Sequence, residues 1–353
     1  MIRNLSIEGF KSFKKVDFSL KPLTLLCGFN NSGKSSIIQA IRMFVNSADG
    51  LSPLLPGHGS VGELRSKYVS TDVPIKFEIT FEGGAEYKFE LSESSHIRPS
   101  LAPLMTYLSA DRWGPRISLP LSHQLSGFPQ IGDRGEFVLG FLHDLRTVVI
   151  PDALHHPSSE GSTLEYEIVG WLSEIAPGVS LSYDTSPKQD SAAIEFDSFR
   201  PTNVGFGLSY CLPILAAILG AVARPPAQGW ESSWGNDWEK IRQSRGRIVM
   251  IENPEAHLHP SGQTALGRMI ALGASCGVQF IIESQSDHLM DGIRLAVKDE
   301  ILKPEQVIFH YLSRDAEGQS KHATPQLQAN GKLDSWPEGF FDQTLKNRSR
   351  LAR

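Results

Sequence analysis

The sequence predicts an α/β protein built on a mixed central sheet, with an antiparallel β lobe beside it and no coiled-coil arm. The first reason is a strand, a glycine-rich loop and a helix that follow one another over residues 23–45. The second is a set of short apolar runs at residues 248–251, 278–282 and 307–312. Helical stretches separate these runs, which is typical of parallel strands with crossover helices.

Alternation of apolar and polar residues predicts the antiparallel lobe. Residues 2–7 and 16–20 alternate on either side of a polar break, so we expect an antiparallel pair, and the alternation returns over residues 73–91. Residues 23–27 are almost continuously apolar and predict a buried strand. Apolar positions then recur at helical spacing over residues 35–45.

The middle of the chain has a less regular pattern. We expect a large head at residues 1–300 and a C-terminal extension at residues 301–353. Within the head, residues 94–200 form a lobe in which few elements are predicted. Residues 223–247 carry the prolines, glycines and polar side chains of a loop or insertion.

Composition limits the functions open to this chain. Its 353 residues, 40% of them hydrophobic, supply ample core for an independent fold. The formal net charge of -5 means that a nucleic-acid contact would need a local basic patch. The three cysteines lie far apart in apolar surroundings, no secretory signal is recognisable, and no apolar run approaches the ~20 residues that span a bilayer. We therefore expect a cytoplasmic protein without a membrane partner.

Residues 28–35, Gly-Phe-Asn-Asn-Ser-Gly-Lys-Ser, fit the phosphate-binding loop pattern between a strand and a helix. Glycines in such a loop let backbone N–H groups surround phosphate oxygens at a helix N-terminus. Lys34 would neutralise the β and γ phosphates of ATP, and the Ser35 hydroxyl would bind Mg²⁺. The residues expected to bind the nucleotide are Asn30, Asn31, Ser32, Gly33, Lys34, Ser35 and Ser36. The alternative is a glycine turn without a ligand.

A second candidate nucleotide-binding motif, rich in acidic residues, follows the apolar strand at residues 248–251. Ligands of open α/β sheets bind at the carboxyl ends of the strands, so Glu252 would hold Mg²⁺ directly or through water. The alternative is a buried strand followed by an acid-rich turn.

Further motifs extend from the start of the chain to its end. They are Ile-Glu-Gly-Phe-Lys-Ser-Phe at residues 7–13, Tyr-Leu-Ser-Ala-Asp-Arg-Trp-Gly-Pro at 107–115, Gly-Asp-Arg-Gly-Glu at 132–136, Glu-Asn-Pro-Glu-Ala-His-Leu-His-Pro at 252–260 and Trp-Pro-Glu-Gly-Phe-Phe-Asp at 336–342. With the phosphate-binding loop they resemble bacterial AAA-type, ABC-like ATPases of the RecF and overcoming-lysogenization-defect kind, over nearly the whole chain. The closing motif resembles the C-terminal domain of unknown function 3696. The resemblance implies an ABC- or SMC-like P-loop NTPase head that encloses two ATP molecules in a head-to-tail homodimer, in anti-phage defence or DNA transactions.

The same resemblance interprets residues 203–209, which precede an apolar helix at residues 212–222, as a degenerate ABC signature loop. Gly205, Gly207 and Ser209 would then meet the γ-phosphate bound to the opposite subunit, at an exposed helix N-terminus. The other interpretation is a glycine turn before a core helix.

Two positions depart from the family pattern. Asn253 occupies the place of the catalytic glutamate, and Gln285 the place of a histidine that touches the γ-phosphate. Asparagine cannot accept a proton, and glutamine cannot shuttle one as imidazole does. Glu255 is the nearest replacement base; otherwise hydrolysis is slow and electrostatically driven. The predicted catalytic set is thus Glu252, Asn253, Glu255 and Gln285.

Histidines and one arginine near these motifs have two interpretations each. His257 and His259 alternate as in a chelating pair, but no further ligand is suggested nearby, so we expect a loop and not a zinc site. His288 is expected on the surface or at a helix cap. Arg112 belongs near the nucleotide or the dimer seam, or else in a buried ion pair.

Aromatic and basic clusters also remain open. Trp230, Trp234 and Trp238 recur every four residues, so a helix would align them as an anchor for a partner or against their own domain, although Gly235 weakens the helix prediction. Two basic clusters would contact phosphates or form a solvated surface. Their members are Lys240, Arg242, Arg245, Arg247, Lys346, Arg348, Arg350 and Arg353.

We therefore predict an ATP-binding and ATP-hydrolysing head that dimerises around MgATP and controls a separate effector protein or a nucleoprotein target. The rival hypothesis is a hydrolysis-poor, nucleotide-gated scaffold that holds and releases a partner protein. A transporter subunit fits the signature loop and the C-terminal motif less well. No nuclease motif is recognisable, so a partner would carry any nuclease activity, and nucleic acid is left open as a further partner.

Overall fold

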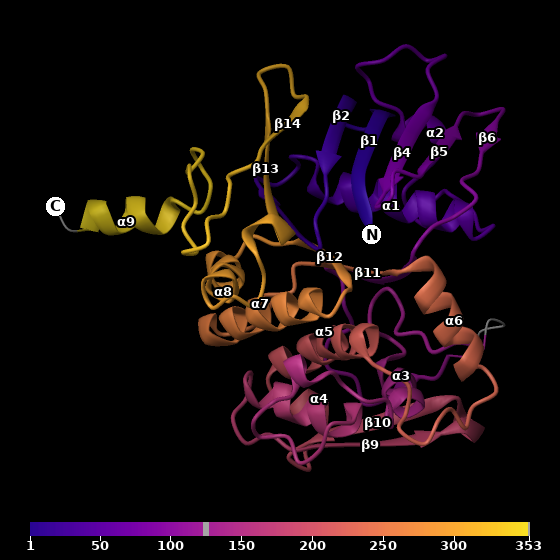
Figure 1. The fold of residues 1–353 in the computed structure, drawn as a ribbon, viewed down its shortest axis with the longest axis vertical. Helices are drawn as coiled ribbons and strands as arrows, with labels where there is room; N and C mark the ends of the chain where they lie inside the picture. The colour runs from indigo at the N-terminus through magenta and orange to yellow at the C-terminus, as the bar shows by residue number, and fades with distance from the viewer. Residues whose placement is uncertain (123–126, 352–353) are drawn as a thin grey trace.

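A six-stranded sheet divides the protein into two layers (Figure 1). The structure is a computed structural model and describes residues 1–122 and 127–351. In spatial order the strands are β14 (Ser320–Ala323), β13 (Val307–Arg314), β3 (Leu23–Gly28), β12 (Gln279–Glu283), β11 (Arg247–Glu252) and β7 (Leu104–Leu108). All neighbours pair in parallel except β14, which is antiparallel to β13. The predicted mixed sheet and its parallel runs are confirmed.

The antiparallel lobe covers one face of this sheet, with helix α1 (Lys34–Ala48) between the two. Its strands, in spatial order, are β2 (Phe13–Ser19), β1 (Ile2–Phe10), β4 (Ile75–Phe81), β5 (Glu86–Leu91) and β6 (His96–Ile97). The predicted pair of residues 2–7 and 16–20 is confirmed, with Ile7 opposite Val16. A short helix, α2 (Val61–Leu64), precedes β4.

Alternate residues of each central strand enter different cores, because successive side chains of a strand point to opposite faces. Ile248 and Met250 of β11 pack in the core with α1 and the antiparallel lobe. Val249 and Ile251 pack in the core on the other face. The helices of that face are α5 (Phe206–Val222), α7 (Pro260–Ser275) and α8 (Asp287–Lys298). Burial on both faces explains why these strands are apolar throughout.

The middle lobe lies beyond α5, at the bottom of Figure 1. It contains β8 (Leu119–Pro120), α3 (Val138–Leu145), α4 (Leu164–Ser173), β9 (Leu181–Ser186) and β10 (Ser191–Phe196). The three strands form a small sheet in the order β8-β10-β9. Single 3₁₀ turns occur at Asp152–Leu154, Pro187–Gln189, Pro201–Asn203 and Pro304–Gln306.

The expected loop at residues 223–247 is corrected by helix α6 (Gly235–Arg245). The rings of Trp230, Trp234 and Trp238 pack against one another, with centroids 5.2 to 5.8 Å apart. A Cβ atom on Gly235 would lie 2.3 Å from the Trp230 ring, so the glycine that weakens the helix prediction is required by the tryptophan packing. Trp238 is 6% exposed, and the other two rings pack against the same core. This cluster belongs to its own domain and does not form a protruding anchor for a partner.

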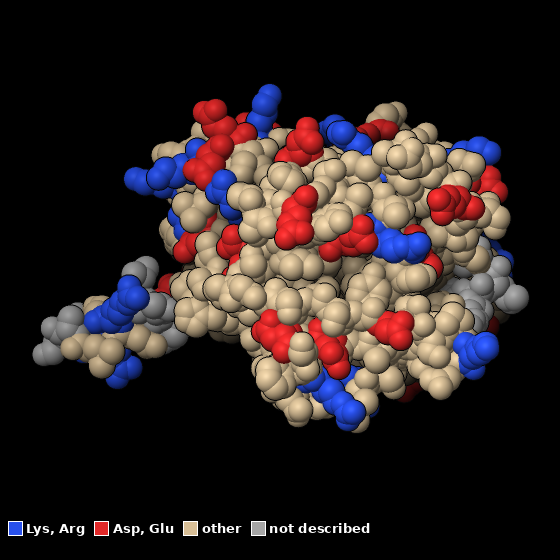
Figure 2. Space-filling model, turned by 90° about the horizontal axis from the view of Figure 1, so that it is seen from below, with Lys and Arg blue, Asp and Glu red and all other residues tan. Residues whose placement is uncertain are grey.

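The C-terminal helix α9 (Gln343–Leu351) projects from the body of the protein (Figures 1 and 2). It carries Lys346, Arg348 and Arg350, whereas Arg353 lies outside the described residues. Because β13 and β14 belong to the central sheet, the sheet continues into the predicted extension, and the division at residue 301 stays a prediction. None of the described helices is long and apolar enough to cross a membrane. Cys27 and Cys211 are buried, Cys276 is partly exposed, and all three are free thiols.

Candidate nucleotide site

The phosphate-binding loop joins β3 to α1, as the sequence predicts. Gly28 has φ +131°, and a Cβ atom there would lie 2.1 Å from the Leu312 carbonyl oxygen of β13. Only glycine therefore allows the loop to leave the sheet beside β13. Gly33 caps α1 with φ +105°, and no side chain among the described residues caps this helix. The Ser32 Oγ is buried without a partner in the described part of the chain.

Lys34 lies beneath the loop with its side chain 4% exposed. Its Nζ donates hydrogen bonds to the carbonyl oxygens of Gly28 at 3.0 Å and Phe29 at 2.9 Å. The same ammonium is 3.8 Å from the Glu283 Oε1. The ammonium charge that the sequence assigns to phosphate binding is thus held next to the loop by two neutral carbonyl groups and one carboxylate.

Glu283, at the end of β12, is a site residue that the sequence did not indicate. The Ser35 Oγ donates a hydrogen bond to the Glu283 Oε2 at 2.9 Å. Burial, and secondarily the charge of Glu252, raise the pKa of Glu283 to about 7. A usable signal was present, because Glu283 ends an apolar run in the same way that Glu252 does. The family resemblance instead assigns a role to Gln285, two residues further on.

Glu252 ends β11 in register with Glu283. Its Oε1 accepts a hydrogen bond from the Tyr107 hydroxyl at 3.1 Å. The guanidinium of Arg42 lies 3.7 Å from the centre of the Tyr107 ring and forms an ion pair with Asp133. Burial raises the pKa of Glu252, with the Tyr107 hydrogen bond opposing this shift. Helix α1 is thereby linked to Glu252 through two side chains.

The contacts of Arg112 bear on its two interpretations, a place near the nucleotide or dimer seam and a buried ion pair. It is 2% exposed and donates hydrogen bonds to the carbonyl oxygens of Ser109, Glu252 and Asn253, each at 2.7 Å. These partners are backbone groups and not a carboxylate, so Arg112 fixes the turn that follows β11. Asn253 in that turn has φ 45°, a left-handed conformation that asparagine adopts more readily than most residues.

Asn30, Glu255 and Gln285 come together above the sheet. The Gln285 backbone N–H donates to the Glu255 Oε1 at 2.9 Å, and the Gln285 Nε2 donates to the Asn30 Oδ1 at 2.8 Å. The Glu255 Oε2 is buried and has no hydrogen-bond partner among the described residues. Asn31 accepts a hydrogen bond from Arg314 at 2.9 Å. The structure therefore brings three of the predicted site residues, Asn30, Glu255 and Gln285, into one polar cluster.

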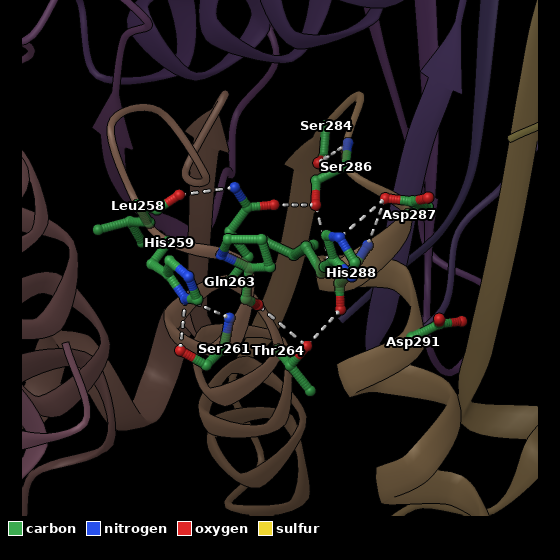
Figure 3. A network of polar contacts seen from close by, with 12 residues as sticks. Leu258, His259, Ser261, Gln263, Thr264, Ser284, Ser286, Asp287, His288 and Asp291 are labelled. Atoms are coloured by element: carbon green, nitrogen blue, oxygen red, sulfur yellow. Dashed lines mark hydrogen bonds and ion pairs between the residues drawn. The ribbon is translucent and has the colours of Figure 1, made fainter. Parts of the chain in front are cut away.

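Gln263 of α7 connects the segments after β11 and β12 (Figure 3). Its Nε2 donates to the Leu258 carbonyl oxygen at 2.9 Å, and its Oε1 accepts from the Ser286 Oγ at 2.5 Å. Ser286 also caps α8 by accepting a hydrogen bond from the Leu289 N–H at 3.0 Å. The loops that carry Glu255 and Gln285 are thus fixed to a common helix.

The predicted signature loop lies elsewhere. Gly205 precedes α5, and within the described residues no hydrogen bond or ion pair joins residues 203–209 to residues 28–36. A Cβ atom on Gly207 would lie 2.9 Å from the His257 carbonyl oxygen, so this glycine allows close contact with the loop after β11. Phe206 is 56% exposed, and the Ser209 Oγ is buried without a partner in the described residues.

The C-terminal segment approaches the phosphate-binding loop from the other side. Phe29, Tyr311, Gly339 and Phe340 help to line a pocket of about 380 Å³ next to this loop. The Tyr311 hydroxyl donates to the Glu338 carbonyl oxygen at 3.0 Å, and a Cβ atom on Gly339 would lie 2.8 Å from the Phe29 ring. The last motif of the sequence is therefore part of the surroundings of the site.

The remaining predicted candidates have structural contacts. His259 caps α7, His257 packs on Tyr210 with ring centres 4.5 Å apart, and His288 is exposed at the start of α8.

The first basic cluster is not a phosphate-binding surface. Arg242, Arg245 and Arg247 donate to the backbone carbonyl oxygens of Ala223, Ala102 and Ala221, respectively, and only Lys240 of this group is largely exposed.

A phosphate-binding loop at the carboxyl edge of a parallel sheet, with carboxylates at the ends of the next two strands, is the arrangement typical of a P-loop nucleotide site. Family models match three parts of the chain: "AAA ATPase domain" over residues 1–113, "AAA domain, putative AbiEii toxin, Type IV TA system" over 182–291, and "Protein of unknown function (DUF3696)" over 302–351. They confirm the resemblance to bacterial AAA-type, ABC-like ATPases of the RecF and overcoming-lysogenization-defect kind with this C-terminal domain. The AAA matches support nucleotide binding and ATPase activity.

Solved structures similar to this chain include three SMC heads. The Smc head bound to the C-winged helix domain of ScpA is 16% identical, with 92% of this chain and 98% of that chain covered and a TM-score of 0.45. The SMC head domain from Thermotoga maritima is 12% identical (92% and 99% covered, TM-score 0.41). The Smc head domain with an extended coiled coil from Pyrococcus furiosus, bound to the C-terminal domain of ScpA, is 14% identical (100% and 99% covered, TM-score 0.42). No curated protein matches the chain in sequence.

Proposed function

We propose that this protein binds MgATP at residues 28–36 and hydrolyses it, as one half of a head-to-tail homodimer that controls a separate effector. The observation that carries the proposal is the state of the loop. Lys34 is buried and bonded to carbonyl groups of the loop itself, while the Ser32 hydroxyl and the N-terminus of α1 have no side-chain partner among the described residues. Donors arranged in this way around a helix N-terminus fit a phosphate group.

The residues present also fit a magnesium ion. Mg²⁺ prefers oxygen ligands, and the Ser35 hydroxyl and the Glu252 carboxylate are the oxygen donors that the sequence assigns to it. Bound there, the ion would neutralise negative charge on the β and γ phosphates. Tyr107 and Arg42 support Glu252 from behind and would hold its carboxylate in a fixed orientation.

Glu255 is our candidate for the base that Asn253 cannot supply. One of its carboxylate oxygens is fixed by the Gln285 N–H, and the other is buried without a partner in the described residues. A carboxylate with a free oxygen can accept a proton from an attacking water. Gln285 would orient Asn30 of the phosphate-binding loop through their hydrogen bond. It would not transfer a proton.

The dimer is supported by the separation of the two predicted half-sites. The Gly205, Gly207 and Ser209 segment does not bond to the phosphate-binding loop of its own chain, and it begins a 17-residue helix that no side chain among the described residues caps. A second copy could supply this helix N-terminus to the γ-phosphate. ATP would then favour the closed dimer and hydrolysis the open one.

The biological role is proposed by analogy. Anti-phage defence or a DNA transaction follows from the family resemblance, and the partner would be an effector protein or a nucleoprotein complex. The three free cysteines are consistent with the proposed cytoplasmic location.

Steady-state ADP release with Mg²⁺ and ATP tests the proposal, with Lys34→Ala as the matched control for contaminating activity. We expect turnover by the wild type that falls by about 100-fold or more in the variant. Equal rates in the two preparations would contradict the ATPase assignment. Tight ATP binding without turnover would instead support the second candidate, a nucleotide-gated scaffold, which the amide side chains of Asn253 and Gln285 favour.

A further inference from the structure

We propose that Glu283 is a metal-side carboxylate of the MgATP site and that, with Ser35, it forms the part of the site that binds the cation. This inference rests on the proposed function and adds to it a residue that the motifs do not assign. Within the described residues, Glu283 is the carboxylate that hydrogen-bonds to Ser35, with 2.9 Å between the Ser35 Oγ and the Glu283 Oε2.

The sheet order explains why Glu283 is well placed. Strand β12 lies between β3, which leads into the phosphate-binding loop, and β11, which ends in Glu252. Glu283 is paired in register with Leu26 on one side and Glu252 on the other. Neighbouring strands are about 4.8 Å apart, so Glu252 lies one strand further from the loop than Glu283. A cation beside Ser35 therefore meets Glu283 first.

The hydrogen bond between the two side chains also has the polarity that a metal site needs. Ser35 donates its hydroxyl hydrogen to the carboxylate, so the lone pairs of its oxygen stay free for a cation. The second Glu283 oxygen faces Lys34 at 3.8 Å. Both oxygens of Glu283 are therefore directed at groups that the nucleotide and its metal would contact.

The charges around Glu283 favour a divalent cation. Glu283 is 7% exposed and lies next to Glu252 on the adjacent strand, so two carboxylates share a poorly solvated edge. Lys34 is the one ammonium that the described structure pairs with Glu283, and phosphate binding would draw this charge away. A buried carboxylate needs a compensating cation, which a magnesium ion supplies when Lys34 is engaged by phosphate.

The competing explanation is that Glu283 only holds Lys34 in place before the nucleotide binds. The two explanations differ in their effect on the metal dependence of binding. A residue that holds Lys34 affects ATP affinity equally with and without Mg²⁺. A metal-side carboxylate affects the gain in affinity that Mg²⁺ provides.

The test is the affinity of a non-hydrolysable ATP analogue, measured by calorimetry with Mg²⁺ and with a chelator, for the wild type and Glu283→Gln. We expect the gain in affinity from Mg²⁺ to shrink by about tenfold in the variant, the loss typical of a perturbed metal shell. The metal-free affinity should stay the same or rise, because a negative charge near the phosphates is removed. An unchanged gain would overturn the proposal.

Two further variants complete the experiment. Glu78→Gln is the matched control, since Glu78 of β4 pairs with Lys88 in the antiparallel lobe and lies outside the nucleotide site, and it should keep the wild-type gain from Mg²⁺. Should Glu283→Gln fail to fold, Glu283→Asp retains the charge but draws it back from Ser35, and it should also lower the gain. A Glu283→Asp variant with the full wild-type gain would count against the proposal.

The experiment distinguishes failure of the Glu283 assignment from failure of the proposed function. If the wild type does not bind the analogue under either condition, or binds it no better than Lys34→Ala does, the nucleotide site itself is wrong. If the wild type binds with a large gain from Mg²⁺ that Glu283→Gln retains, the nucleotide site stands and the assignment of Glu283 fails.

Discussion

The phosphate-binding loop and the predicted signature loop differ in how far their side chains are paired within the same chain. Around the first, Lys34, Ser35 and Gln285 all have partners supplied by neighbouring strands and loops. Around the second, Phe199 and Phe206 are 58% and 56% exposed. Large aromatic side chains that remain exposed near one another in the sequence are typical of a surface that another molecule covers.

This difference indicates which parts of catalysis the single chain can supply. The strands fix the positions of the groups expected to bind phosphate and metal, because all of them lie at one edge of one sheet. The segment expected to contact the γ-phosphate packs through Gly207 against His257 in the loop after β11, and within the described residues no hydrogen bond or ion pair joins it to the phosphate-binding loop. We therefore expect nucleotide binding to survive in an isolated chain and turnover to need a second one.

Mixing two inactive variants tests most directly whether the active site is shared between two chains. Lys34→Ala damages the phosphate-binding loop, and Phe206→Asp places a negative charge on the exposed signature side without touching the core. Each variant alone should lose about 100-fold of its ATPase rate. A 1:1 mixture should recover about a quarter of the wild-type rate, because half of randomly assorted dimers would carry one site with both halves intact.

The readout of the mixture is ADP release against total protein concentration. Each variant measured alone at the doubled concentration is the control. A mixture that stays as inactive as its components would contradict a site shared between two chains, and full activity of Phe206→Asp alone would remove the signature side from the reaction.

A smaller effect is expected for Tyr107→Phe, which probes the part of the site that contains Glu252 and the phosphate-binding loop. The substitution removes the hydroxyl that bonds to Glu252 at 3.1 Å while keeping the ring beneath Arg42. Loss of one such hydrogen bond, about 1 kcal/mol, should lower kcat by about fivefold. The KM for ATP should change little, since Tyr107 does not line the phosphate-binding loop. A change confined to KM would show that the bond acts on binding.

The smallest effect concerns stability and pH in the absence of nucleotide. Burial raises the pKa of Glu283 from its ordinary value of 4.5 to about 7, so between these values the folded protein holds a proton that the unfolded chain has released. The contribution of Glu283 to the free energy of unfolding is then largest at low pH and falls as pH rises through this window. Glu283→Gln lacks this loss. Its Tm relative to the wild type should therefore rise from about pH 5 to about pH 8 by a few degrees.

Thermal unfolding of both proteins across this pH range measures the difference. Glu283→Gln is the useful comparison because its side-chain oxygen can still accept the Ser35 hydrogen bond. A difference in Tm that is constant with pH would show that Glu283 titrates alike in the folded and unfolded chains.

Local features of the site were predictable from the sequence, and long-range ones were not. The loop at residues 28–36 and the acid at the end of β11 belong to contiguous motifs whose geometry follows from a strand, a turn and a helix. Glu283 depends on β12 lying between β3 and β11, and strand order is not written in the pattern of any one strand. Helix α6 was missed because Gly235, a poor helix former, is retained for the packing of Trp230.

The same distinction applies to the lobes. The antiparallel strands were predicted because alternation is visible along each strand. The five residues of β7 could not be recognised, since a short strand inside an irregular region becomes one only by pairing with β11. The contact between Phe29 and Gly339 joins residues near opposite ends of the chain and left no local signal.

The position of β3 also sets an order of events during protein synthesis. Its two neighbours in the sheet are β12 and β13, whose residues Phe280 and Val307 pair with the region of Leu23. A nascent chain on the ribosome that has not yet released these strands has no partner for β3 on either side. Such late pairing is slow and leaves an apolar strand exposed to aggregation while it lasts. ATP would therefore have no ordered loop to bind until β12 and β13 have left the ribosome, and it would stabilise only a chain that already contains both strands.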